Sequence, residues 1–245
     1  MAHVTIFHTS DMHNKLTADY AHTLRNLKAG TPGSLMFDSG DAIWSGNIYW
    51  RLGGEPVLDL MNSVPYDALC MGNREFHFLG IGVNGKIHRA LFPVLSANIR
   101  PAKKSGHAPV PSHATFERDG VRVAVFGLTV PCITERMLVK KVSDYYFEPP
   151  ISTAAAMVQK LKKEADIVIA LTHIGIKSDR ELAEGVPGID LILGGHTHVL
   201  AEERVGETCV IHHGFYAHYV GRVDLNIESG KITQITNELI PLAKA

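Results

Sequence analysis

Five segments of the chain carry side chains that divalent metal ions prefer, and each follows a short apolar run. In chain order, these segments are Ser10-Asp11-Met12-His13, Asp38-Ser39-Gly40-Asp41, Gly72-Asn73-Arg74-Glu75, His173 and Gly194-Gly195-His196-Thr197-His198. Their carboxylate, amide and imidazole groups together suit borderline divalent ions such as Mn, Fe, Co, Ni or Zn. Two such ions about 3.5–4 Å apart, bridged by one carboxylate, form a two-metal hydrolytic centre. The residue types therefore point first to metal-dependent hydrolysis.

The spacing within two of these segments favours shared ligands. In Asp11-x-His13 both side chains lie on one side of an extended segment and can bind one ion, whereas His196-x-His198 can bind one ion or divide between two. Taken singly, each motif also has a structural interpretation, because Asp, Asn and Gly are common in turns and caps. Their occurrence in order, in a chain with 14 histidines, favours metal binding.

The apolar runs before the motifs are predicted strands, and further strands are predicted along the chain. The predicted strands are Val4–His8, Ser34–Phe37, Ala68–Met71, Val94–Ala97, Val121–Leu128, Ile167–Thr172, Leu191–Leu193, Cys209–His212, Arg222–Ile227 and Ile232–Leu239. The predicted helices are Tyr20–Lys28, Pro56–Asn62, Lys86–Leu91 and Ser152–Glu164. Asp119-Gly120 is a predicted hairpin turn, and Arg100–His113 is a predicted loop. This order predicts a layered α/β fold in one domain over residues 1–245, with the motifs at the carboxyl ends of strands.

Composition excludes several classes of function. The 24 basic and 25 acidic residues give a net charge of −1, so long nucleic acid and anionic membranes are not expected partners. No apolar run approaches the roughly 18–20 residues of a membrane span, and the first residues do not resemble a signal peptide. Three widely spaced cysteines predict reduced thiols and a cytoplasmic protein. Residues 80–85 fit G-x-G-x-x-G but do not directly follow a strand, so dinucleotide binding is not expected.

The combined motifs resemble those of the calcineurin-like metallophosphoesterases. DMH, SGD, GNRE, LTHIG and GGHTH occur in that order, and VPGIDLILGGHTHV, VAVFGLT and HYVGRVDL are similar to the metallophosphatase domain of the 5′-nucleotidase family. The similarity extends from Val4 to about Pro241. It implies a four-layer α-β-β-α sandwich of two mixed β-sheets flanked by helices, with a dimetal site on one rim.

Carried over motif by motif, the resemblance implies two sets of metal ligands that share Asp41. The first ion would be held by Asp11, His13, Asp41 and His198, and the second by Asp41, Asn73, His173 and His196. The resemblance further implies a hydrolase of small phosphomonoesters or phosphodiesters, nucleotides among them, in which a metal-bridging hydroxide attacks phosphorus.

Two positions depart from the family pattern. The family has His after the ligand Asn and an Asp three residues later, where this chain has Arg74 and His77. Arg74 can stabilise charge in a transition state but cannot act as an acid, because its pKa lies above about 12. We hypothesise that Arg74 binds the phosphoryl group and His77 is the general acid. The alternative is that both replacements mark a weak or inactive enzyme.

Substrate specificity is not determined by these motifs. Full-length 5′-nucleotidases continue into a second domain that binds the nucleoside, and this chain, which stops at Ala245, is expected to lack it. Trp44, Tyr49 and Trp50 follow Asp41 and could line a pocket or serve only in packing. A cyclic-nucleotide phosphodiesterase or nuclease, and a non-catalytic binding module with the same fold, are the alternative functions. The native metals and the oligomeric state are not indicated.

Overall fold

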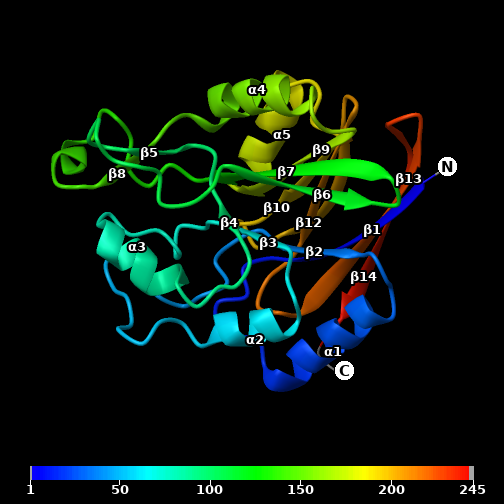
Figure 1. The fold of residues 1–245 in the computed structure, drawn as a ribbon, viewed down its shortest axis with the longest axis horizontal. Coiled ribbons are helices and arrows are strands. Elements are labelled where there is room, and N and C mark those ends of the chain that lie inside the picture. Colours follow the sequence, from blue (N-terminus) through cyan, green and yellow to red (C-terminus); the bar gives the residue numbers. More distant parts are fainter. Residues whose placement is uncertain (1, 243–245) are drawn as a thin grey trace.

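Two mixed β-sheets pack face to face in the computed structural model, which describes residues 2–242 (Figure 1). The first sheet has six strands in the order β14 (Lys231–Pro241), β13 (Tyr219–Glu228), β1 (Ala2–Thr9), β2 (Leu35–Asp38), β3 (Ala68–Cys70) and β4 (Val94–Leu95). The second has six strands in the order β11 (Leu200–Val205), β12 (Thr208–His213), β10 (Leu191–Gly194), β9 (Ile167–His173), β7 (Val121–Thr129) and β6 (His113–Arg118).

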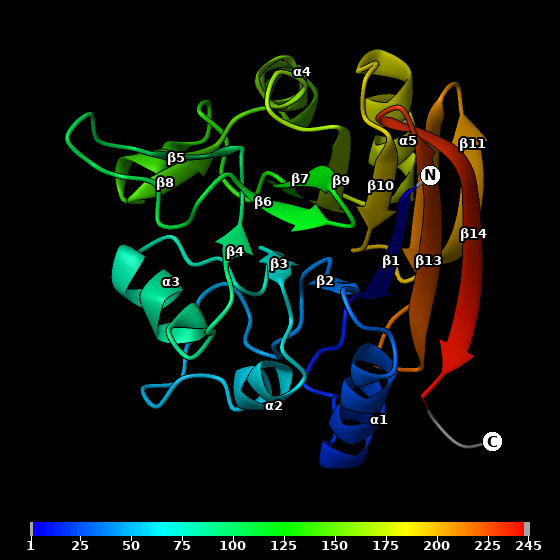
Figure 2. The same cartoon turned by 45° about the vertical axis from the view of Figure 1, so that its right-hand side comes forward.

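Helices cover the outer face of each sheet, as the two ribbon views show (Figures 1 and 2). The first sheet is covered by α1 (Ala18–Ala29), α2 (Val57–Ser63) and α3 (Gly80–Ile87), and the second by α4 (Pro150–Leu161) and α5 (Ile176–Gly185). This confirms the predicted four-layer α-β-β-α sandwich. No helix among residues 2–242 is long and apolar enough to cross a membrane.

Successive apolar side chains of the central strands point to opposite faces, so the first sheet has an apolar surface on each side. On β1, Val4 and Ile6 face the second sheet, where they join Val123, Ile169 and other fully buried side chains. Phe7 points the other way and packs in the core beneath α1 and α2. Successive side chains of a strand point to opposite faces, so a strand covered on both faces must be apolar throughout.

The parallel strands determine where the polar motifs lie. β1, β2 and β3 are parallel neighbours in one sheet, and β9 and β10 are parallel neighbours in the other. Parallel strands share one edge for their carboxyl ends, where open α/β sheets bind ligands. The two sheets are joined at that edge, because the Ser39 hydroxyl donates a hydrogen bond to the Leu193 carbonyl at 2.7 Å.

Most of the predicted elements are present, and the Asp119-Gly120 hairpin is confirmed between the antiparallel strands β6 and β7. Both turn residues have positive φ angles, 49° and 73°, as a two-residue hairpin turn of type I′ requires. The predicted loop Arg100–His113 contributes to β5 (Ile99–Pro101), which pairs with β8 (Tyr145–Phe147) in a small separate sheet. Neither α5 nor β11 was predicted from the sequence.

The predicted helix Lys86–Leu91 is wrong, because the helix of this segment is α3, Gly80–Ile87. Glycines disfavour helices, but here they allow close packing. A Cβ atom on Gly82 would overlap the ring of His77, and one on Gly85 would overlap the ring of Trp50. The G-x-G-x-x-G pattern is therefore explained by the contacts of α3 with two rings.

Candidate metal centre

The loops after β1 and β10 bring three predicted ligands together. Nε2 of His198 lies 3.3 Å from Oδ1 of Asp11 and 3.1 Å from Nε2 of His13. The Asp11 and His13 atoms are themselves 3.8 Å apart. All three ligand atoms lie within 4.8 Å of one another, so one cation could contact all of them.

A second group lies directly beside the first. Oδ1 of Asp41, after β2, is 3.4 Å from Nε2 of His173 at the end of β9, and Asp11 belongs to this group as well. Nδ1 of His196 lies 3.2 Å from the same His173 nitrogen. Asp11 is thus common to both groups and Asp41 to only one of them. The assignment of Asp41 as the bridging ligand stays a prediction.

Several ligand atoms are buried without a hydrogen-bond partner among the described residues. They are Oδ1 of Asp11, Oδ1 of Asn73 and Nδ1 of His13. A buried polar atom without a partner costs about 1–3 kcal/mol, and native proteins contain few of them. Carboxylate, amide and imidazole atoms of this kind are ligands for divalent ions, so the residues present fit a metal centre.

A main-chain hydrogen bond orients His173 toward the cluster. Its Nδ1 lies 2.8 Å from the Ser39 carbonyl oxygen, which can only accept, so Nδ1 carries the hydrogen. Nε2 is therefore the atom that faces Asp41. Hydrogen bonds of this type set the tautomer and the ring orientation of metal-binding histidines.

Backbone strain is concentrated at the same residues. Positive φ angles occur at Asp11 (50°), His13 (45°), Asp41 (54°), His196 (81°) and His198 (54°). Such conformations cost roughly 1–3 kcal/mol each in residues other than glycine and persist where the surroundings impose them. Backbone hydrogen bonds provide that restraint, since Asp11 N–H donates to the Gly40 carbonyl and His13 N–H to the Asp41 carbonyl, both at 2.9 Å.

Glu75 fixes the loop that carries Asp41. Its carboxylate accepts hydrogen bonds from the N–H groups of Asp41 and Gly72, both at 2.9 Å, and of Ile43 at 3.3 Å. Gly72 is required in this loop, because a Cβ there would overlap Oδ1 of Asp41. Glu75 belongs to a motif found in the sequence, but its role becomes visible only in the fold.

The electrostatics of the cluster favour positive charge. Burial alone would raise the pKa of Asp41, but the adjacent His173, the Arg74 N–H and His13 together outweigh it and lower that pKa. Burial would likewise lower the pKa of His173, but Asp41, Asp11 and Glu75 together outweigh it and raise that pKa. Burial, followed by Asp41, raises the pKa of Glu75 to about 7. Closely spaced buried carboxylates thus stabilise a cation between them.

Arg74 lies against the second group. Its backbone N–H donates to Oδ1 of Asp41 at 2.8 Å, and its Nε lies 3.5 Å from Oδ2 of the same residue. Its Nη1 donates to the Trp44 carbonyl at 2.6 Å. The carbonyl of Arg74 accepts from Nζ of the fully buried Lys86, which also donates to the carbonyls of Phe76 and Gly46.

His77 lies outside the cluster. Its Nδ1 accepts from the Leu79 N–H at 2.9 Å, so its Nε2 carries the hydrogen and donates to the Ile48 carbonyl at 3.2 Å. The residue is only 1% exposed, with Trp50 and Phe78 against its ring. Both ring nitrogens therefore bind main-chain groups in this conformation.

Aromatic rings surround the first group. The ring of Phe215 stacks on His198 with centroids 4.8 Å apart, and the ring of Tyr216 lies 5.3 Å from that of His13. Trp44 lies 6.1 Å from His13. Phe215 and Tyr216 were not predicted as site residues, although they lie just beyond the end of β12 and the strand-end rule that located the ligands applies to them.

Known proteins resemble this chain in sequence. The profile of the family described as calcineurin-like phosphoesterase matches residues 4–200. The trifunctional nucleotide phosphoesterase protein YfkN of Bacillus subtilis is 30% identical over 273 residues, which cover 94% of this chain and 18% of YfkN. Protein UshA of Yersinia enterocolitica is 28% identical over 285 residues, which cover 98% of this chain and 52% of UshA.

The fold also has a counterpart among solved structures. The structure of a 5′-nucleotidase precursor from Thermus thermophilus matches with a TM-score of 0.81 and 21% identity, covering 98% of this chain and 54% of that one. The chain thus spans about half, or less, of the length of these relatives.

Proposed function

Because the chain belongs to the calcineurin-like phosphoesterase family, we propose that it is a metal-dependent hydrolase of phosphoric esters that uses two divalent ions. The observation that carries the proposal is the pair of adjacent ligand groups that share Asp11. The unpartnered atoms of Asn73 and His13 add to the ligand set.

The names of the relatives indicate the substrate class. YfkN is a nucleotide phosphoesterase, and the structural match is a 5′-nucleotidase precursor. We infer that this chain acts on small phosphomonoesters or phosphodiesters, nucleotides among them. A near-neutral net charge supports small substrates over long nucleic acid.

The proposed ligand assignment follows the family motifs, in which Asp41 is shared, whereas the two groups in the structure share Asp11. Asp11, His13, Asp41 and His198 would hold one ion, and Asp41, Asn73, His173 and His196 the other, with Mn, Fe, Zn, Co or Ni compatible with these donors. When bound, such ions lower the pKa of water and neutralise charge on phosphoryl oxygens.

Arg74 supplies a fixed positive charge next to this centre. Its guanidinium is held between Asp41 and the Trp44 carbonyl, which positions it to bind a phosphoryl oxygen. A planar guanidinium donates several hydrogen bonds and stays charged throughout the working pH range. Lys86 restrains the Arg74 main chain, so Lys86 is a positioning residue for this contact.

The role of His77 as general acid stays a prediction, and its contacts define a test. If the Nε2 proton leaves the Ile48 carbonyl to protonate the leaving oxygen, His77→Ala will lower kcat by about 10²-fold and abolish the alkaline limb of the pH–rate profile. His77→Gln keeps a donor in the same place without an acid function, so it serves as the structural control. Unchanged rates across pH in His77→Ala would contradict the acid role.

The single-domain organisation and a cytoplasmic location also belong to this proposal. Cys70, Cys132 and Cys209 are all free thiols, as in proteins of reducing compartments.

Hydrolysis of p-nitrophenyl phosphate and bis(p-nitrophenyl) phosphate, with Mn²⁺ and after treatment with a chelator, tests the function. We expect turnover that requires the metal, and the ratio of the two rates will separate monoesterase from diesterase. Two bound ions per chain without turnover under any divalent metal would favour a binding module instead. Turnover of cyclic nucleotides or oligonucleotides above both probes would favour the phosphodiesterase or nuclease alternative.

A further inference from the structure

The Trp44 side chain presents an open aromatic face beside the ligand cluster. Its ring meets the ring of His13 edge-on, at 6.1 Å and 79°, yet Trp44 remains 52% exposed. His13 itself is only 3% exposed. The part of Trp44 that does not cover His13 is therefore available for contact with another molecule.

Arg74 holds Trp44 in this position. The guanidinium carbon lies 5.1 Å from the centre of the Trp44 ring, and its Nη1 donates to the Trp44 carbonyl. Arg74 thus makes both a cation–π contact and a charged hydrogen bond to Trp44. These contacts restrict the motion of the ring more than is usual for an exposed tryptophan. The residue proposed to bind the phosphoryl group and the open aromatic face are thus in direct contact.

Tyr216 places a second ring at the same ligands. Its centroid is 5.3 Å from that of His13 and 5.5 Å from that of His198. Tyr216 and Ala217 have φ angles of 57° and 54°, and the Tyr216 N–H donates to the Asp11 carbonyl at 2.9 Å. A bulky residue in the left-handed region is an outlier whose persistence indicates a local requirement. Here the strained turn positions a ring edge-on beside two predicted ligands.

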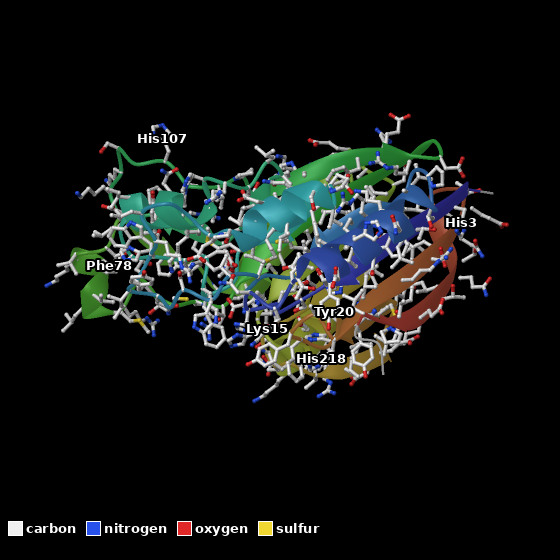
Figure 3. The ribbon with its side chains drawn as sticks, turned by 90° about the horizontal axis from the view of Figure 1, so that it is seen from below. His3, Lys15, Tyr20, Phe78, His107 and His218 are labelled. Carbon is white, nitrogen blue, oxygen red and sulfur yellow. The ribbon has the colours of Figure 1, made fainter. Side chains whose placement is uncertain are left out.

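The rim beyond these rings is open and polar. His218, whose ring is 5.1 Å from that of Phe215, is exposed, as is Lys15. In Figure 3 the labelled side chains of His218 and Lys15 lie along the same edge of the molecule, and Phe78 lies well to the left of both.

We propose that Trp44 and Tyr216 form a subsite for a planar ring in the leaving group, so that the enzyme selects phosphate esters of ring-bearing alcohols. The inference rests on the proposed function, because it assigns the leaving-group side of that site. Of the three aromatic residues singled out in the sequence, only Trp44 belongs to it. Trp50 packs on His77, and Tyr49 makes no ring contact with the ligands among residues 2–242.

Two substrates that differ in the leaving group test the subsite kinetically. The probes are phenyl phosphate and n-butyl phosphate, both followed by release of inorganic phosphate with Mn²⁺ present. Stacking on an aromatic side chain stabilises a bound ring, so Trp44→Leu and Tyr216→Leu should each lower the phenyl-to-butyl ratio of kcat/KM by about tenfold. Trp44→Phe and Tyr216→Phe should restore most of that ratio.

A binding measurement separates this inference from the proposed function. The chain has two tryptophans, so Trp50→Phe leaves Trp44 as the single tryptophan fluorophore. We expect phenylphosphonate, which is not hydrolysed, to change Trp44 fluorescence and to bind at least about tenfold more tightly than methylphosphonate. The subsite proposal is overturned, and the proposed function is not, if the two phosphonates bind with equal affinity. The same holds if the enzyme is active and both Leu variants keep the wild-type phenyl-to-butyl ratio. Lack of turnover by the wild-type protein would overturn the proposed function while leaving the fluorescence result interpretable.

Discussion

Asp41→Asn is expected to lower metal-dependent phosphoester hydrolysis on the order of a thousandfold or more. Asp41 contacts Nε2 of His173 at 3.4 Å and accepts the backbone N–H of Arg74 at 2.8 Å. The amide removes a negative charge from the predicted bridge and replaces one oxygen by a donor. The substitution therefore both weakens metal binding and alters the position of Arg74.

The fold should survive this substitution. Asp41 has a φ of 54°, and asparagine is among the residues that tolerate the left-handed region. The main-chain hydrogen bond from Asp41 N–H to Glu75 is independent of the Asp41 side chain. A loss of activity with unchanged thermal unfolding of the metal-free protein would therefore report on the centre.

Asp38→Asn is the matched control, because Asp38 is the last residue of β2, three positions before Asp41, and is also buried. Its carboxylate accepts from the Thr9 hydroxyl at 2.6 Å and the Gly40 N–H at 2.8 Å. Burial raises its pKa well above the usual range, so the site already favours an uncharged group. We expect Asp38→Asn to retain two bound metals per chain, measured by elemental analysis. Wild-type rates in Asp41→Asn would show that the proposed centre is wrong.

The position of this centre can be predicted from sequence because the rule involved is geometric. Parallel strands share an edge for their carboxyl ends, so the motifs after β1, β2 and β3 had to meet at one edge, and those after β9 and β10 at another, if those runs were strands. The packing of the two sheets then brings the two sets together. The family inferred from the same motifs is confirmed by the match over residues 4–200. Local pattern and chain direction were sufficient for the family and for the strand ends that carry the motifs.

Contacts between distant segments could not be predicted in this way. Glu75 receives its role from three N–H groups that only the folded loops bring together. Tyr216 reaches His13 through a strained turn more than 200 residues away along the chain. The helix at Gly80–Ile87 depends on glycines that fit two rings, where intrinsic propensity indicates no helix. In each case tertiary packing overrides the local signal.

A buried histidine pair between the sheets makes the free energy of unfolding depend strongly on pH in the acidic range. Nδ1 of His8 on β1 lies 2.7 Å from Nδ1 of His213 on β12, and the two residues are 0% and 2% exposed. Two nitrogens at this distance share one hydrogen, so both rings cannot be cationic. Burial lowers the pKa of His213 to about 4, and burial followed by the nearby His213 lowers that of His8 as well.

The sign of the effect follows from proton linkage. In the unfolded chain these histidines have pKa values of about 6.5, so below that pH the unfolded state binds more protons than the folded state. The stabilisation that comes from neutral histidines is complete above pH 6.5 and is lost as the pH falls toward 4. For His213 the loss by pH 4 is about 3 kcal/mol.

The change in unfolding free energy between pH 7 and pH 4 should therefore be about 3 kcal/mol smaller in His213→Gln than in the wild-type protein. Glutamine can keep a hydrogen bond to Asn237, which lies 2.8 Å from Nε2 of His213, and it has no proton to gain. Denaturant titrations of the metal-free protein measure this change. Burial also lowers the pKa values of His13 and His196, but these two residues contribute equally to the pH dependence of both proteins. His22→Gln, at an exposed position in α1, controls for removal of any histidine. If the free energy of unfolding depends on pH in the same way in the wild-type and His213→Gln proteins, the pair is already charged in the folded state. In that case a contact other than that of neutral imidazoles holds the sheets together at this point.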